Sequence, residues 1–149
     1  MSFPIETSKF VIIIDRCLPI GKMANAIGHL SLGIGRSLNA MDIKHSTFNN
    51  SEVGYVSYLT DHPLIILGAK SDVQIRNLHN LIKKQDIPHN IFFDNMFEHD
   101  VPTQISQIQA TPISELIYTA IIVFGSNTQI DPLTKKFSLL RENSLLPGE

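Results

Sequence analysis

The feature that most limits the possible folds is a set of short, uninterrupted apolar runs separated by segments with helical periodicity. Residues 11–14 are all β-branched, and residues 64–67 and 117–124 are also strongly apolar. Such runs are too short to span a membrane. Continuous rather than alternating apolar residues are typical of strands that are buried on both faces of a sheet. These runs therefore predict a central sheet covered by helices on both sides.

Two helices are predicted between these strands. After Lys22 the apolar residues follow a single helical stripe, which predicts a helix over residues 22–36. That stripe consists of Met23, Ile27, Leu30 and Ile34. Ser71 with Gln74 three residues later predicts a capping box at the start of a second helix, which ends near Lys84.

The order of strands and helices predicts an α/β fold. Four strands are expected, at residues 10–14, 64–67, 90–93 and 117–124. Intervening helices imply βαβ crossovers, hence a three-layer α/β/α sandwich with a mixed, mostly parallel sheet of about four strands. Less regular segments are expected at 53–59 (an edge strand or irregular packing), at 102–109 (a helical turn) and at 131–140 (a short C-terminal segment).

Bulk properties indicate one globular domain over residues 1–149, with a tail at 141–149. Hydrophobic residues make up 43% of the chain and charged residues 17%. The formal net charge of −2 disfavours a nucleic-acid partner, because such proteins usually carry a basic surface. Cys17, the only cysteine, is expected to be a small buried residue. No signal peptide or membrane span is recognisable, so a cytoplasmic protein is expected. A homodimer is a possible assembly.

The residues with the clearest chemical potential lie at the start of the first helix. Lys22, Asn25 and His29 are three and four residues apart, so they share one helix face. A lysine at a helix N-terminus opposes the helix dipole by roughly 0.3–1 kcal/mol, whereas the same helix end attracts anions. This pattern indicates a site for a phosphate, a carboxylate or an oxyanion. The alternative is that the polar stripe is simply the solvated face of the helix. The histidines show no metal-binding spacing, so neither a metal nor a cofactor is expected.

Several of these residues resemble motifs of type II peptidyl-tRNA hydrolase. Asp15, Gly21, Lys22 and His29 have the spacing of that family's first strand, loop and helix. Residues 63–69 resemble its second strand, residues 130–134 resemble its C-terminal motif, and Asp94 stands where the family has an aspartate after its third strand. The resemblance implies the hydrolase fold and a shared site built from Lys22, Asp94 and His29.

The sequence also departs from that family. Ala26 occupies the position of a glutamine, Ile13 that of an arginine, and residues 95–98 lack the family's glycine and threonine. The Leu-Pro-Ile-Gly sequence at 18–21, followed by Ala-Asn-Ala at 24–26, more closely resembles a bacterial family of unknown function (domain of unknown function two thousand) that shares this fold. This second resemblance implies the hydrolase fold and does not by itself imply the hydrolase reaction.

Two functions follow as hypotheses. In the first, the domain binds a small anionic ligand or a protein partner around Lys22, with Asp15, Gly21 and Asn25 contributing to the site. In the second, it is an esterase-type hydrolase of a peptidyl-tRNA-like or smaller ester. Lys22 would then stabilise the oxyanion, Asp94 would orient Lys22 or act as the base, and His29 would complete the polar cluster. The site prediction is that Lys22 and Asp94 lie at one edge of the sheet, close enough to interact directly or through one water.

Overall fold

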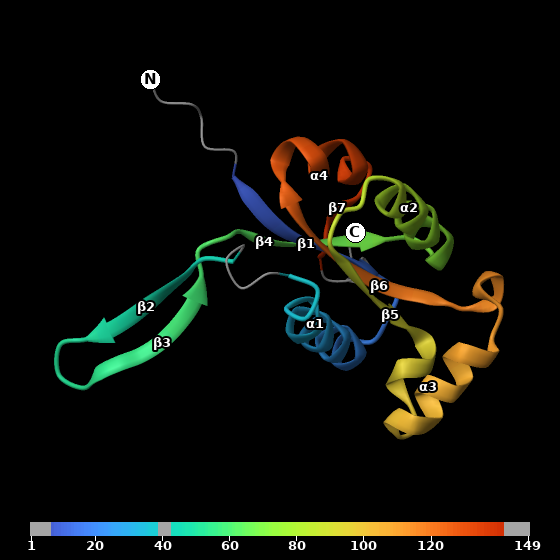
Figure 1. Ribbon diagram of the computed structural model, residues 1–149, viewed down its shortest axis with the longest axis horizontal. Coiled ribbons are helices and arrows are strands. Elements are labelled where there is room, and N and C mark those ends of the chain that lie inside the picture. The colour runs from blue at the N-terminus through green and yellow to red at the C-terminus, as the bar shows by residue number, and fades with distance from the viewer. Residues whose placement is uncertain (1–6, 39–42, 142–149) are drawn as a thin grey trace, which may run out of the picture.

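The computed structural model describes residues 7–38 and 43–141 (Figure 1). Its strands are β1 Ser8–Asp15, β2 His45–Asn50, β3 Gly54–Thr60, β4 Leu64–Ala69, β5 His89–Phe93, β6 Tyr118–Ser126 and β7 Ser138–Leu139. Its helices are α1 Ile20–Ile34, α2 Asp72–Lys84, α3 Val101–Ala110 and α4 Asn127–Thr134, with short 3-10 helices η2 Asp94–Phe97 and η3 Ile113–Glu115. In this part of the chain, no helix is both long and apolar enough to cross a membrane.

The main sheet has five strands in the order β5-β6-β1-β4-β7. Only β1 and β4 are parallel neighbours, and the other three pairs are antiparallel. The expectation of a mostly parallel sheet is therefore wrong. After β5 the chain passes through η2 and α3 and returns at the end where β5 finished, with Phe93 opposite Tyr118. A strand that re-enters at that end has to run in the opposite direction.

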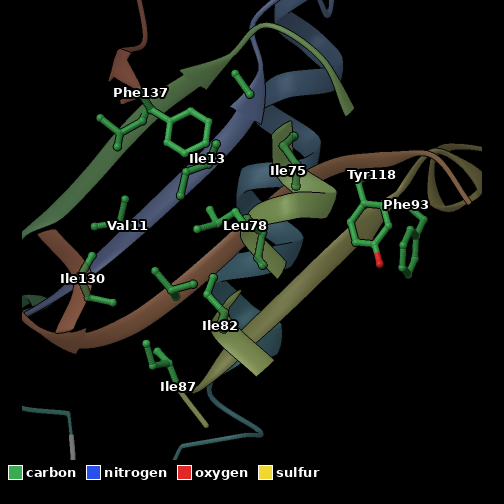
Figure 2. Packing of buried hydrophobic residues seen from close by; sticks show 14 of the residues in the cluster. Val11, Ile13, Ile75, Leu78, Ile82, Ile87, Phe93, Tyr118, Ile130 and Phe137 are labelled. Atoms are coloured by element: carbon green, nitrogen blue, oxygen red, sulfur yellow. The ribbon is translucent and has the colours of Figure 1, made fainter. Parts of the chain in front are cut away.

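Helices cover both faces of this sheet, as expected for three layers. Alternate residues of β1 show the arrangement, because successive side chains of a strand point to opposite faces. The sheet separates two hydrophobic cores. In one, Ile12 and Ile14 pack with Leu30 of α1; in the other, Val11 and Ile13 pack with α2 and α4 (Figure 2). Figure 1 shows α1 on one side of the sheet and α2 with α4 on the other.

Two local expectations near helix starts are wrong. Ser71 precedes α2 but its side chain forms no cap; instead the Gln74 side chain accepts a hydrogen bond from the backbone N–H of Lys70 at 2.8 Å. Cys17 is exposed rather than buried. The Asp15 carboxylate accepts a hydrogen bond from the Cys17 N–H at 2.9 Å, and this Asx-type turn lies in the surface loop between β1 and α1.

The C-terminal segment begins earlier than residue 131. The Ser126 hydroxyl accepts a hydrogen bond from the Gln129 N–H at 3.2 Å and caps α4, which therefore starts at Asn127. The chain then forms β7, which pairs with β4 at the edge of the sheet. Of the expected tail at 141–149, residues 142–149 lie outside the described residues.

Residues 45–60 form a second, two-stranded sheet that we call the arm. The segment expected as an edge strand or irregular packing is β3 of this hairpin, paired with β2 rather than with the main sheet. Figure 1 shows the arm extending away from the body of the molecule. Neither of its strands contains a buried residue.

Candidate functional site

A cavity of about 600 Å³ lies between α1 and α3, and we call it the α1–α3 cavity. The elements around it are the polar face of α1, the edge strand β5, η2 and the apolar face of α3, which lies beyond β5 (Figure 1). Its lining residues are Asn25, His29, Leu30, Asn90, Ile91, Phe92, Met96, Phe97, Val101, Gln104, Ile105 and Ile108.

The polar stripe of α1 forms one wall of this cavity. Asn25 and His29 are one helical turn apart and both line it. Lys22, a further turn toward the helix start, lies at the edge, because its Nζ is 5.1 Å from the centroid of the Phe97 ring. This distance is typical of a cation–π contact. The structure thus brings together three residues that the sequence singled out.

Two phenylalanines connect the two ends of that stripe. The ring centroids of Phe92 and Phe97 are 4.7 Å apart, and the imidazole centroid of His29 is 6.2 Å from that of Phe92. Phe92 is buried in the core behind α1. The cavity therefore has an aromatic surface between a cation at one end and an imidazole at the other.

The opposite wall is fixed by hydrogen bonds around the start of α3. The Gln104 Nε2 donates to the carbonyl oxygens of Met96, Glu98 and His99 at 3.2, 2.9 and 3.1 Å. The Asp100 carboxylate accepts from the Thr103 N–H at 2.9 Å and caps the helix, and its hydrogen bonds with Thr103 hold the pKa of Asp100 below its ordinary value. The Gln104 NH2 group is thus used within the protein.

A glycine permits the close approach of α1 to β5. A Cβ atom added to Gly33 would overlap the Nδ2 of Asn90. Gly33 therefore stands where α1 comes close to the side chain of Asn90 on β5. Gly28, by contrast, faces open space and has no such role. Asn90 is held in turn by its own backbone, because its Oδ1 accepts from the Ile91 N–H at 3.1 Å.

The other candidate residues lie outside the cavity lining. Strands β1 and β5 run in the same direction, since each is antiparallel to β6. Asp15 and Asp94 therefore lie at the same end of the sheet, where β1 and β5 finish. Among the described residues, however, Lys22 forms no ion pair with Asp94 or with any other acid. Asp15 is used by the loop that it stabilises, and Gly21 has open space around its Cα.

The lining of the α1–α3 cavity holds few titratable groups. The lining contains no Asp or Glu, and His29 is its only titratable side chain. Across residues 7–38 and 43–141, no three potential ligands are grouped as a metal ion would require. The cavity offers apolar area, a few amides and an imidazole, with one cation at its edge.

Comparison with known proteins identifies the family. The family model described as "protein of unknown function (DUF2000)" matches residues 8–141. The chain belongs to the DUF2000 family. A solved structure of a protein of unknown function from Agrobacterium tumefaciens strain C58 is similar, with a TM-score of 0.77 and 15% identity, covering 89% of this chain and 96% of that one. At that identity the likeness concerns the fold alone. No curated protein matches the chain.

The wall that α3 contributes to this DUF2000 domain was not foreseen as part of a site. The sequence indicated only a helical turn at 102–109, from the spacing of Ile105 and Ile108. Val101 and Ile105 are 63% and 59% exposed in the structure. The aliphatic residues of α3 are the signal that could have indicated an apolar wall of a cavity. The sequence does not show that α3 lies opposite the polar stripe of α1, because only the fold brings the two helices together.

Proposed function

We propose that this DUF2000 domain binds a small molecule that has an apolar, partly aromatic body and one anionic group. The body occupies the α1–α3 cavity and the anionic group meets Lys22. The observation that carries the proposal is the position of the Lys22 ammonium over Phe97, at the edge of a cavity whose walls are mostly apolar.

The size and lining of the cavity support a small-molecule ligand. Ligand sites typically measure about 300–1,000 Å³ and combine apolar walls with a few polar groups. The volume here, about 600 Å³, falls in that range. Asn25 and His29 supply polar groups along one wall, while Phe92 and Phe97 offer aromatic surface.

The charge around Lys22 supports an anionic ligand. No acid lies in the first turn of α1, and Pro19 at its N-cap provides no side-chain hydrogen bond. The exposed N–H groups and positive dipole of this helix end favour a negative charge. Because no acid among the described residues pairs with Lys22, an incoming carboxylate, sulfonate or phosphate would meet an ammonium group without a competing carboxylate.

The hydrolase hypothesis has weaker support. The spacing of Asp15, Gly21, Lys22 and His29 resembles type II peptidyl-tRNA hydrolase, and a relation to that fold remains a proposal. Hydrolysis would need a base near the reacting carbonyl, and Asp94 neither lines the cavity nor pairs with Lys22. We therefore place binding ahead of ester cleavage.

Calorimetric titration with anilinonaphthalene sulfonate, an apolar aromatic anion, tests where binding occurs. Replacing Ile105 by the larger Trp fills the α1–α3 cavity, so we expect Ile105→Trp to weaken binding by at least about tenfold, or about 1.4 kcal/mol. Val73→Trp is the matched control, because Val73 is similarly exposed, at 53%, on α2. Undiminished affinity in a folded Ile105→Trp protein would contradict the proposal, as would an equal loss in the control.

A further inference from the structure

A second cavity lies on another flank of α1, and we call it the α1–β7 groove. It has a volume of about 670 Å³, and none of the described residues lines both this groove and the α1–α3 cavity. The loop before α1, one side of that helix and the chain that follows β7 form its walls. Its volume and its largely apolar walls are typical of a small-molecule site. The apolar lining includes Leu18, Ile20, Met23, Ala24, Ile27 and Leu140.

Two arginines also line this groove. Arg16 and Arg141 are two of the four arginines of the chain, and the lining contains no Asp or Glu. Across residues 7–38 and 43–141, neither guanidinium group pairs with an acid. A guanidinium that no carboxylate of the protein occupies is available to an anion from solution, and its planar fork matches the geometry of a carboxylate.

Backbone hydrogen bonds to β4 hold both arginines beside the groove. The N–H of Arg16 donates to the carbonyl oxygen of Ala69 at 3.0 Å, and the N–H of the residue before Arg141 donates to that of Ile66 at 3.0 Å. The side-chain stem of Arg16 lies over Gly68, because a Cβ atom added to this glycine would be 3.2 Å from the Cβ of Arg16. The two cations are therefore attached to one strand of the sheet, and Gly68 leaves room for the Arg16 stem.

The two arginines enter the groove from different ends. Arg16 follows the end of β1, whereas the antiparallel course of β7 carries Arg141 back towards the start of β4. Between them, Ile20 and Ile27 line the groove from α1 and are seven residues apart. At 1.5 Å per residue, the groove follows about 10 Å of the helix. A ligand that reaches both guanidinium groups therefore needs an anionic group at each end.

We propose that the α1–β7 groove binds an aliphatic dicarboxylate, with one carboxylate at Arg16 and the other at Arg141. The described lining holds no aromatic side chain, unlike that of the α1–α3 cavity, so a methylene chain matches its walls better than an aromatic body does. Arginine stays protonated throughout the physiological pH range. The two cations therefore remain available at any pH at which the ligand is a dianion.

Calorimetric titration with nonanedioate and nonanoate tests the proposal on the full chain. The two carboxylates of extended nonanedioate stand about as far apart as the groove is long, and nonanoate lacks one of them. The wild type should bind nonanedioate with a Kd below about 1 mM and about three- to tenfold more tightly than nonanoate. Arg16→Met and Arg141→Met should each weaken nonanedioate binding about threefold or more, and together they should remove its advantage over nonanoate.

Two control variants locate the binding. Arg36→Met removes an exposed arginine just beyond the end of α1 and should bind nonanedioate like the wild type. Ile105→Trp fills the α1–α3 cavity and should also leave this affinity unchanged, so the proposal is independent of the ligand proposed for that cavity. No binding by the wild type at millimolar concentration, equal affinity for the two acids, or an equal loss in either control would overturn the proposal.

The only cysteine of the chain provides a second measurement that does not depend on how the variants fold. Cys17 is exposed and lines the α1–β7 groove. Saturating nonanedioate should slow the alkylation of Cys17 by iodoacetamide in the wild type several-fold, because the bound chain covers the thiol. An unchanged alkylation rate would overturn the proposal.

Discussion

His79 should make the stability of this protein fall in mild acid. Its side chain on α2 is 7% exposed, and its Nδ1 lies 3.0 Å from the hydroxyl of Tyr118. Burial, followed by the charges of His89 and Lys83, lowers the pKa of His79 from 6.5 to about 4. The unfolded chain therefore takes up this proton at a higher pH than the native protein does, and protonation favours unfolding.

The magnitude and direction follow from this difference. The contribution is fully present above pH 6.5, decreases as the pH falls towards about 4, and then levels off. At about 1.4 kcal/mol per pH unit, the loss amounts to at most about 3.5 kcal/mol once the pH is well below 4. We expect urea denaturation of the wild type to show a loss of about 2–3 kcal/mol from this residue between about pH 7.5 and pH 4.

A variant that cannot titrate isolates this effect. His79→Gln retains a hydrogen-bonding side chain near Tyr118 and should reduce the difference in unfolding free energy between the two pH values by that amount. His29→Gln, at an exposed position on α1, should leave the difference unchanged. An identical pH dependence in His79→Gln and the wild type would refute the reasoning.

Three further outcomes are expected. Ile13→Ala should lower the unfolding free energy by about 2–5 kcal/mol in urea titrations, because Ile13 of β1 is fully buried in the core that α2 covers; a loss below about 1 kcal/mol would contradict this packing. Gly33→Ala should change the unfolding free energy by less than about 1 kcal/mol, because only the flexible end of the Asn90 side chain has to move and alanine is favoured over glycine in a helix; a loss above about 2 kcal/mol in urea titrations would contradict this. The purified protein should show little or no peptidyl-tRNA hydrolysis, because phosphate contacts dominate tRNA binding and the chain has only 12 basic residues against 14 acidic ones. Robust turnover that collapses in both Lys22→Ala and Asp94→Asn would restore the hydrolase assignment.

The sequence predicted those parts of the fold that local patterns control. The β-branched run at 11–14 identified β1, and the helical stripe identified α1, although the helix begins at Ile20 rather than at Lys22. The direction of β6 could not be read in this way. It depends on which end of the sheet the chain reaches after α3, and that is a property of packing rather than of the apolar run itself.

The candidate site was predicted on one side only. Lys22, Asn25 and His29 could be placed together because helix geometry fixes their relation. The facing wall comes from α3, which lies more than seventy residues later in the sequence, and no local pattern links Ile105 to Asn25. The sequence also predicted that Lys22 and Asp94 lie at one end of the sheet, close enough to interact directly or through one water. No direct ion pair forms between them, because the Lys22 ammonium lies over Phe97, and a contact through water stays a prediction.

The measurement that tests the proposed function most directly compares two ligands of nearly the same shape, one charged and one neutral. Anilinonaphthalene sulfonate is the anion, and phenyl-naphthylamine lacks its sulfonate. The wild type should bind the anion about three- to tenfold more tightly, as expected for one partly exposed ion pair. Lys22→Met should abolish this preference while the neutral ligand binds as before, and the control Lys84→Met, at the far end of α2, should retain it. An anion preference that survives in Lys22→Met would contradict the assignment of Lys22 as the anion-binding residue.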